Sequence, residues 1–240
     1  MYIYCTGWDK RAAYGWQRNG GHAPYLLASV QSLVHLPEPL TYLDGAILGC
    51  GLGTAYGACL RADLSGRDKL LITALGPVGL GVALLAQKFG ASVLGTDPDP
   101  WRVEFAEKLG VKGIVCAKPE EGGADEDVKR VQEWSGGEGP DVAIDCSGSG
   151  MARLTCLKAV RPWARVVFVG EGGDLNVEVS PIIIHKSLAI YGSWVCSVTE
   201  LEDLTRLLVQ WDLHPEVRSI TCTIDKLDVF PGHRHGRVYS

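Results

Sequence analysis

Short apolar runs rich in β-branched residues alternate with longer amphipathic runs from residue 69 onward. The short runs predict strands at 69–74, 92–96, 113–116, 141–146, 165–170 and 187–195. The longer runs repeat hydrophobic residues every three or four positions and predict helices at 79–89, 101–109, 125–134, 151–160 and 200–211. Because the predicted strands are apolar on both faces, they require helices on both sides of one parallel sheet. The pattern therefore predicts an α/β fold with a doubly wound parallel sheet.

The two ends of the chain differ from this pattern. Residues 1–45 are rich in Gly, Trp and Tyr and have weak periodicity, whereas 212–240 carries His, Pro and Gly. Residues 70–86 lack charge, but glycine and proline interrupt them and they fall short of the roughly 18 apolar residues of a membrane span. We therefore expect no membrane segment.

Composition narrows the classes of partner. The 240 residues have a net charge of −5 and no basic stripe, which argues against a nucleic-acid partner. The eight cysteines form no Cys-x-x-Cys pair, and the first ten residues do not form a signal peptide. These features predict reduced thiols and a cytoplasmic protein.

One turn carries a candidate chemistry. The sequence ALGPVG at 74–79 lies between a predicted strand and a predicted helix, with Ala74 where a dinucleotide-binding turn has its first glycine. Gly76 would let the backbone approach a pyrophosphate, and Gly79 would let the helix pack closely on the strand. Asp97 ends the second strand, where a carboxylate bonds the adenosine ribose and repels a 2′-phosphate. We therefore expect NAD rather than NADP.

Several motifs together resemble one known family. They are GGHAPYLL (20–27), HLPEPLTYLDGAILGCGLGTAYGA (35–58), LGPVGLG (75–81), GTDPDPWR (95–102), DVAIDCSGS (141–149), VVFVGEGG (166–173) and IYGSWV (190–195). From about residue 5 to 215 the chain resembles the medium-chain, zinc-dependent alcohol dehydrogenases. The resemblance implies a Rossmann domain at 52–205, flanked by partial segments of a GroES-like catalytic domain at 1–51 and 206–240. It also implies NAD-dependent oxidation of a small alcohol or polyol.

The same resemblance implies roles for residues that contact the cofactor. Thr54 matches a position beside the nicotinamide, and Arg102 matches a basic residue near the adenosine phosphate. The pyrophosphate turn matches Gly76, Pro77 and Val78. Backbone positions that hold the carboxamide match Val169, Ser193 and Val195.

The resemblance also implies zinc. Cys50 matches one of three protein ligands of a catalytic zinc, and Cys5 matches the last of four cysteines at a structural zinc. The second cysteine and the Gly-His-Glu segment of the catalytic site have no match in the chain. We therefore expect a chain that lacks most of its catalytic domain, binds NAD(H) and has little or no alcohol turnover.

Two alternatives remain open. The chain could be a non-catalytic NAD(H)-binding module that acts through a partner protein, or a zinc-free reductase of the same superfamily.

The apolar strand at 187–195 would be the last strand in its sheet and would leave an exposed edge. Relatives pair this strand across a dimer axis, so the resemblance implies a homodimer or homotetramer.

Overall fold

The computed structural model describes residues 12–215. Its strands are β1 (Lys69–Thr73), β2 (Ser92–Asp97), β3 (Lys112–Val115), β4 (Val142–Asp145), β5 (Arg165–Phe168) and β6 (Ala189–Gly192). They form one parallel sheet in the order β3-β2-β1-β4-β5-β6. The sequence places β1 first, yet it lies at the centre, so the chain winds outward from it in both directions. This arrangement confirms the doubly wound parallel sheet.

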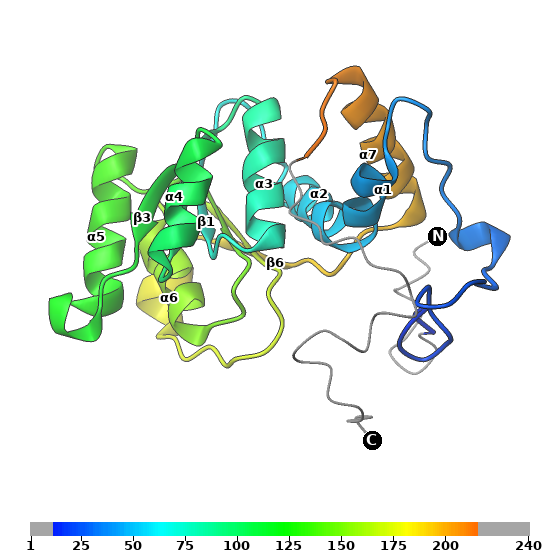
Figure 1. Ribbon diagram of the computed structural model, residues 1–240. Helices are drawn as coiled ribbons and strands as arrows, with labels where there is room; N and C mark the ends of the chain where they lie inside the picture. Colours follow the sequence, from blue (N-terminus) through cyan, green and yellow to red (C-terminus); the bar gives the residue numbers. More distant parts are fainter. Residues whose placement is uncertain (1–11, 216–240) are drawn as a thin grey trace.

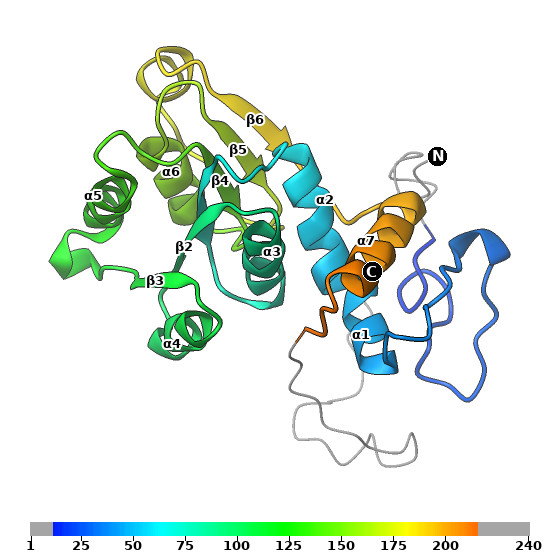
Figure 2. The same cartoon turned by 90° about the horizontal axis from the view of Figure 1, so that it is seen from above.

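Helices cover both faces of the sheet (Figures 1 and 2). The connecting helices are α3 (Pro77–Lys88), α4 (Pro100–Lys108), α5 (Gly123–Ser135) and α6 (Gly150–Ala159). Figure 2 shows α3 and α4 on one side of the sheet and α5 and α6 on the other. Single turns of helix lie at η2 (Val30–Ser32), η4 (Pro119–Glu121) and η5 (Ser180–Ile184).

The core consists of two apolar clusters, one on each face. Leu70 and Ile72 of β1 belong to the cluster beneath α3, and Leu71 between them belongs to the cluster beneath α6. All three side chains are fully buried. Successive strand residues point to opposite faces, so an unbroken apolar run is the pattern that a strand covered on both sides requires.

A helical run that the hydrophobic pattern did not predict precedes the sheet. It consists of α1 (Tyr42–Ile47), a π-helical turn η3 (Leu48–Leu52) and α2 (Gly53–Arg61). By length and composition Tyr42–Arg61 could cross a membrane, although 56% of its most apolar stretch is buried inside the protein. Buried core helices meet the same criterion. The run escaped prediction because α2 is buried along most of its length and so lacks a polar face.

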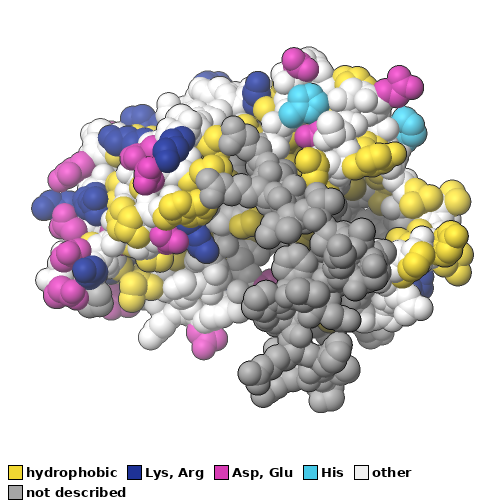
Figure 3. All heavy atoms as spheres, in the orientation of Figure 1, with side chains coloured by type: hydrophobic (Ala, Val, Ile, Leu, Met, Phe, Trp, Pro, Cys, Tyr) yellow, Lys and Arg dark blue, Asp and Glu magenta, His cyan; other side chains and the backbone are white. Residues whose placement is uncertain are grey.

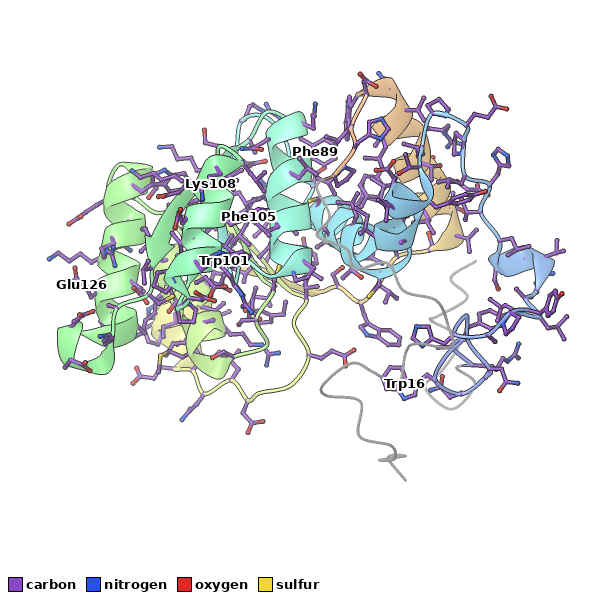
Figure 4. The ribbon with its side chains drawn as sticks, in the orientation of Figure 1. Trp16, Phe89, Trp101, Phe105, Lys108 and Glu126 are labelled. Carbon is purple, nitrogen blue, oxygen red and sulfur yellow. The ribbon has the colours of Figure 1, made fainter. Side chains whose placement is uncertain are left out.

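The last described helix, α7 (Val198–Gln210), packs beside α2. Leu204 and Leu208 are fully buried in the same cluster as α3, and Trp211 meets Phe89 edge to face at 5.7 Å. Figure 4 shows Phe89 at the end of α3 that faces α7. Consequently the helical run 42–61 and α7 share one core with the sheet.

The candidate nucleotide-binding site

The turn between β1 and α3 leaves the start of a helix uncapped. Ala74 adopts a left-handed conformation with φ +71°, and its N–H bonds the carbonyl of Thr96 on β2 at 2.8 Å. Gly76 precedes the first residue of α3 and has no side chain that could cap this helix. The positive end of the helix dipole and its first amides are therefore left to meet an anion.

Two glycines of this turn serve different purposes. A Cβ on Gly79 would lie 1.9 Å from the carbonyl oxygen of Ala74, so the helix packs on the turn at a distance that only glycine allows. A Cβ on Gly76 would meet nothing within 4 Å. Gly79 is thus required by the fold, whereas the open space at Gly76 is available to a ligand.

Asp97 links β2 to the turn at 74–79, which is called the phosphate turn below. Its carboxylate accepts a 2.8 Å hydrogen bond from the N–H of Leu75 and a 2.9 Å bond from the N–H of Asp99. The side chain is buried, and a guanidinium nitrogen of Arg102 lies 3.5 Å from it. Asp99 is half exposed and lies 3.9 Å from the same guanidinium. Two carboxylates therefore stand at the carboxyl end of β2, beside the turn.

Aromatic side chains brace the helix that carries Arg102. Trp101 and Phe105 stack nearly parallel with ring centres 5.7 Å apart. Figure 4 shows them on successive turns of α4, followed by Lys108. The stack adds a contact between the first two turns of α4, the helix that carries Arg102.

The three backbone positions expected to hold a carboxamide line one cavity. Val169, Ser193 and Val195 border a space of about 430 Å³ at the carboxyl end of β5 and β6. The N–H of Ser193 bonds the carbonyl of Phe168 at 2.9 Å, which continues the pairing of β6 with β5. Val195 has φ +52°, so the chain turns away from the sheet at this residue.

Helix α2 closes this cavity from the other side. A Cβ on Gly57 would lie 2.7 Å from the carbonyl oxygen of Val195, so α2 meets the 193–196 segment with backbone against backbone. Thr54 lies one turn earlier on α2 and is buried. Neither Thr54 nor Cys50 borders the cavity.

Cys50 lies in the π-helical turn η3 and is exposed. Such turns are frequent at functional sites. Cys196 is nearby, but burial, with smaller contributions from Glu200 and Cys50, raises the pKa of its thiol to about 11. Cys5 lies outside the described residues.

The described residues do not fit a zinc site. Within 12–215 no group of three His, Cys, Asp or Glu side chains could hold a metal ion. Zinc in a catalytic site needs three protein ligands. Of the residues expected to bind metal, Cys50 is the one that the structure describes, and it would supply one of the three ligands.

Sequence reasoning did not identify the charged residues around the cavity. Arg153 of α6 borders it, and Asp145 ends β4 next to it. Glu171 also borders the cavity and accepts a hydrogen bond from the indole N–H of Trp194. The only sequence signal for them is a carboxylate at the end of a buried strand, a position where parallel sheets place functional groups.

Comparison with known proteins agrees with this geometry. The sequence profile described as "Zinc-binding dehydrogenase" matches residues 77–210. The uncharacterized zinc-type alcohol dehydrogenase-like protein YphC of Escherichia coli is 44% identical over 214 residues, which are 89% of this chain and 59% of YphC. L-threonine 3-dehydrogenase of Pyrococcus horikoshii is 32% identical over 75% of this chain and 50% of its own length.

Solved structures give the same result. Alcohol dehydrogenase TADH from Thermus sp. ATN1 superposes on this chain with a TM-score of 0.64 at 28% sequence identity. The superposition covers 74% of this chain and 50% of the TADH chain. The chain thus spans about half to three fifths of the length of these three proteins.

Proposed function

Because the chain belongs to the zinc-binding dehydrogenase family, we propose that it binds NAD(H) and serves hydride transfer between a small alcohol or polyol and the nicotinamide ring. The turn at 74–79 carries this proposal. It combines an uncapped helix start, an open space at Gly76 and a close helix contact at Gly79. These are the requirements for a pyrophosphate held by backbone amides.

The carboxyl end of β2 supports NAD over NADP. Asp97 and Asp99 place two negative charges beside the turn, and within residues 12–215 the guanidinium of Arg102 alone pairs with them. A 2′-phosphate on the adenosine ribose would add further negative charge at this place. We propose that NADH binds more tightly than NADPH.

The nicotinamide end would lie toward β5 and β6. A dinucleotide crosses a doubly wound sheet at the carboxyl ends of its strands, with the pyrophosphate at the central strand. If Asp97, on one side of β1, bonds the adenosine ribose as proposed, the cavity on the other side of β1 would receive the nicotinamide. The backbone of Val169, Ser193 and Val195 would bond the carboxamide there. Thr54 does not border the cavity, but it lies one turn from Gly57, which does, and we propose that it stands on the side of α2 nearest the ring.

The chain's own zinc chemistry is not part of this proposal. Cys50 stands where the family resemblance places a zinc ligand, but the described residues offer no complete set. This observation favours a second candidate function, a nucleotide-binding module without alcohol turnover of its own. Measurement of steady-state NADH production from small alcohols and polyols distinguishes the two candidate functions.

The domain division at 52–205, with flanking catalytic segments at 1–51 and 206–240, is part of the same proposal.

Two further properties belong with the proposed function. β6 ends the sheet, and the exposed side chains of Ile190 and Tyr191 lie on it. We propose that this edge pairs with a second copy of the chain. All six described cysteines are free thiols, which supports a reducing, cytoplasmic setting.

Gly76→Ala tests the proposed function. Since a Cβ at this position meets no protein atom, we expect the variant to fold with unchanged stability. The same Cβ would occupy the place of the pyrophosphate, so NADH affinity should fall by roughly tenfold or more, which corresponds to about 1.4 kcal/mol. NADH fluorescence titration and urea unfolding measure the two quantities.

Gly21→Ala is the matched control, because its Cβ also meets nothing within 4 Å and it lies in a loop away from the turn. It should change neither quantity. Wild-type affinity for NADH in the Gly76→Ala variant would refute the proposed site.

A further inference from the structure

The loop after β5, which borders the cavity, meets the loop after β4 backbone to backbone. A Cβ on Gly148, after β4, would lie 2.0 Å from the carbonyl oxygen of Glu171, after β5. A Cβ on Gly170 would lie 2.1 Å from the N–H nitrogen of Gly148. The N–H groups of Val169 and Gly170 bond the carbonyl of Asp145 at 2.9 and 3.1 Å and hold the start of the loop after β5. Beyond that point glycine leaves no side chains to interlock, so the rest of the loop depends on a side chain from another element.

Arg153 of α6 supplies that group. Its two terminal nitrogens donate hydrogen bonds to the carbonyls of Gly170 and Gly173 at 2.7 and 2.8 Å. The side chain is only 13% exposed, and its Nε lies 3.4 Å from Asp145. A buried guanidinium whose planar fork bonds two carbonyls of one loop sets both the position and the orientation of that loop.

Asp145 holds this guanidinium by charge alone, since the Nε of Arg153 has no hydrogen-bond partner among the described residues. Its carboxylate is completely buried and accepts hydrogen bonds from the hydroxyl of Thr73 at 2.8 Å and the N–H of Ser147 at 3.0 Å. Thr73 is the last residue of β1, directly before the phosphate turn. The charge of Arg153 is therefore tied to the strand that carries the turn.

The same network reaches β6. Glu171, inside the loop that Arg153 holds, accepts a hydrogen bond from the indole of Trp194. Trp194 lies between Ser193 and Val195, two of the three backbone positions at the cavity. Val169, the third, directly precedes Gly170. One connected set of contacts thus sets the positions of all three.

We infer that Arg153 is a positioning residue for the nicotinamide end of the cofactor. The guanidinium holds the backbone at 169–173, and through Glu171 the backbone at 193–195, at the distances that a carboxamide needs. This inference rests on the proposed function. Arg153 reaches the cavity from α6, on the opposite side of the sheet from α2 (Figure 2), and each of its terminal nitrogens donates a hydrogen bond to the loop after β5, so its role in this inference is to position that loop.

Comparison of NADH with ADP-ribose tests the inference, because ADP-ribose keeps the adenosine and pyrophosphate but lacks nicotinamide. In the full 240-residue chain, we expect Arg153→Met to weaken NADH binding by about tenfold, since loss of charge-assisted bonds is of that size. ADP-ribose binding should change by less than about twofold, because the phosphate turn is intact. Calorimetric titration of both ligands gives the ratio of NADH affinity to ADP-ribose affinity. A general loss of structure would weaken both ligands alike.

Arg161→Met is the matched control. Arg161 forms a 2.7 Å ion pair with Asp141, which directly precedes β4 and so lies at the end of this strand opposite to Asp145. The Arg161→Met variant should leave the ratio of NADH affinity to ADP-ribose affinity unchanged. Trp194→Phe removes the indole N–H while Arg153 remains, and it should also lower the ratio of NADH affinity to ADP-ribose affinity. This variant replaces Arg153→Met in the test if Arg153→Met does not fold. Unchanged ratios in both cavity variants overturn the inference, as does an equal change in Arg161→Met.

The two levels of proposal fail differently. If wild type binds ADP-ribose but gains nothing from the nicotinamide of NADH, the positioning role is wrong while nucleotide binding stands. If wild type binds neither ligand, the proposed function itself is wrong.

Discussion

At the scale of single residues, the phosphate turn stores backbone strain. Ala74 occupies the left-handed region at φ +71°, where its Cβ is unfavourable by roughly 1–2 kcal/mol. The sequence shows only that alanine replaces a glycine. The structure shows that the replacement kept the glycine conformation, because the N–H of Ala74 bonds β2 and its carbonyl packs against Gly79.

Ala74→Gly should therefore stabilise the protein. Relief of the strain, less the entropy that glycine loses on folding, predicts a gain of about 0.5–1 kcal/mol in the free energy of unfolding. Urea unfolding followed by tryptophan fluorescence measures it. Ala83→Gly, in the middle of α3, is the control and should lose about 1 kcal/mol. A loss of stability in both variants would mean that Ala74 is not strained.

The cysteines should differ in reactivity according to burial. Burial raises the pKa of Cys59 to about 12 and, with Asp127 and other neighbours, that of Cys116 to about 11. At pH 8 both remain protonated, and only the thiolate is nucleophilic. Exposed Cys50 should therefore be alkylated by iodoacetamide before Cys59 and Cys116, as peptide mapping will show. Alkylation of Cys59 at an equal rate would contradict the described burial.

At the scale of elements, α1 depends on a single carboxylate. Asp44 accepts hydrogen bonds from the N–H and hydroxyl of Thr41, both at 2.7 Å, and lies 2.9 Å from Nδ1 of His214. The bond with Thr41 completes a capping box, and the contact with His214 ties α1 to the segment after α7. Burial would raise the pKa of Asp44, but the bonds from His214 and Thr41 outweigh it and hold this pKa below its usual value.

This lowered pKa predicts an acid-dependent loss of stability. The ionised Asp44 stabilises the folded state above its unfolded pKa of about 3.9, and this contribution disappears as the pH falls through the lower folded pKa. Asp44→Asn should lower the free energy of unfolding by about 1–3 kcal/mol at pH 7 and less at pH 2–3. Glu138→Gln, an exposed carboxylate on a turn, should change little at either pH. Urea unfolding at both pH values is the measurement, and a loss in Asp44→Asn that is equal at both pH values would contradict it.

At the scale of the whole molecule, two of the exposed apolar regions among the described residues bear on association. One is the edge strand β6. The other is the segment around η2, where Leu27 and Val30 are more than four fifths exposed and where Figure 3 shows hydrophobic side chains together on the surface. Edge strands and apolar patches of this kind are sites of association.

Ile190→Pro should separate a dimer that pairs through β6. The N–H groups of Ala189 and Ser193 bond β5, so that of Ile190, an odd number of residues from both, points to the open edge. Proline removes this outward donor and leaves the bonds to β5 in place. Light scattering should show a shift from dimer to monomer, whereas Ile190→Val should remain dimeric. A dimer that survives the proline would place the interface elsewhere.

The sequence alone determined the strands of the sheet and the position of the turn at 74–79, because local patterns mark both. Apolar runs at 69–74 and 141–146 fixed the buried strands, and ALGPVG at 74–79 fixed the turn between strand and helix. Periodicity and glycine spacing act over a few residues, so they can be read without the fold. The helix 53–61 was missed because burial on nearly all sides removes the periodicity on which prediction depends.

Only the tertiary structure decided what surrounds the cavity. Arg153 and Asp145 lie eight residues apart, but the carbonyls that Arg153 holds come from a loop some twenty residues further on, and the indole beside Ser193 comes from the segment after β6. No local pattern marks these residues, because their contacts exist only when β1, β4, β5 and β6 end at the same edge of one sheet. Backbone contacts between Gly148 and Gly170 likewise depend on that edge, since glycine is read from the sequence as a turn and becomes a packing residue only when a second loop lies against it.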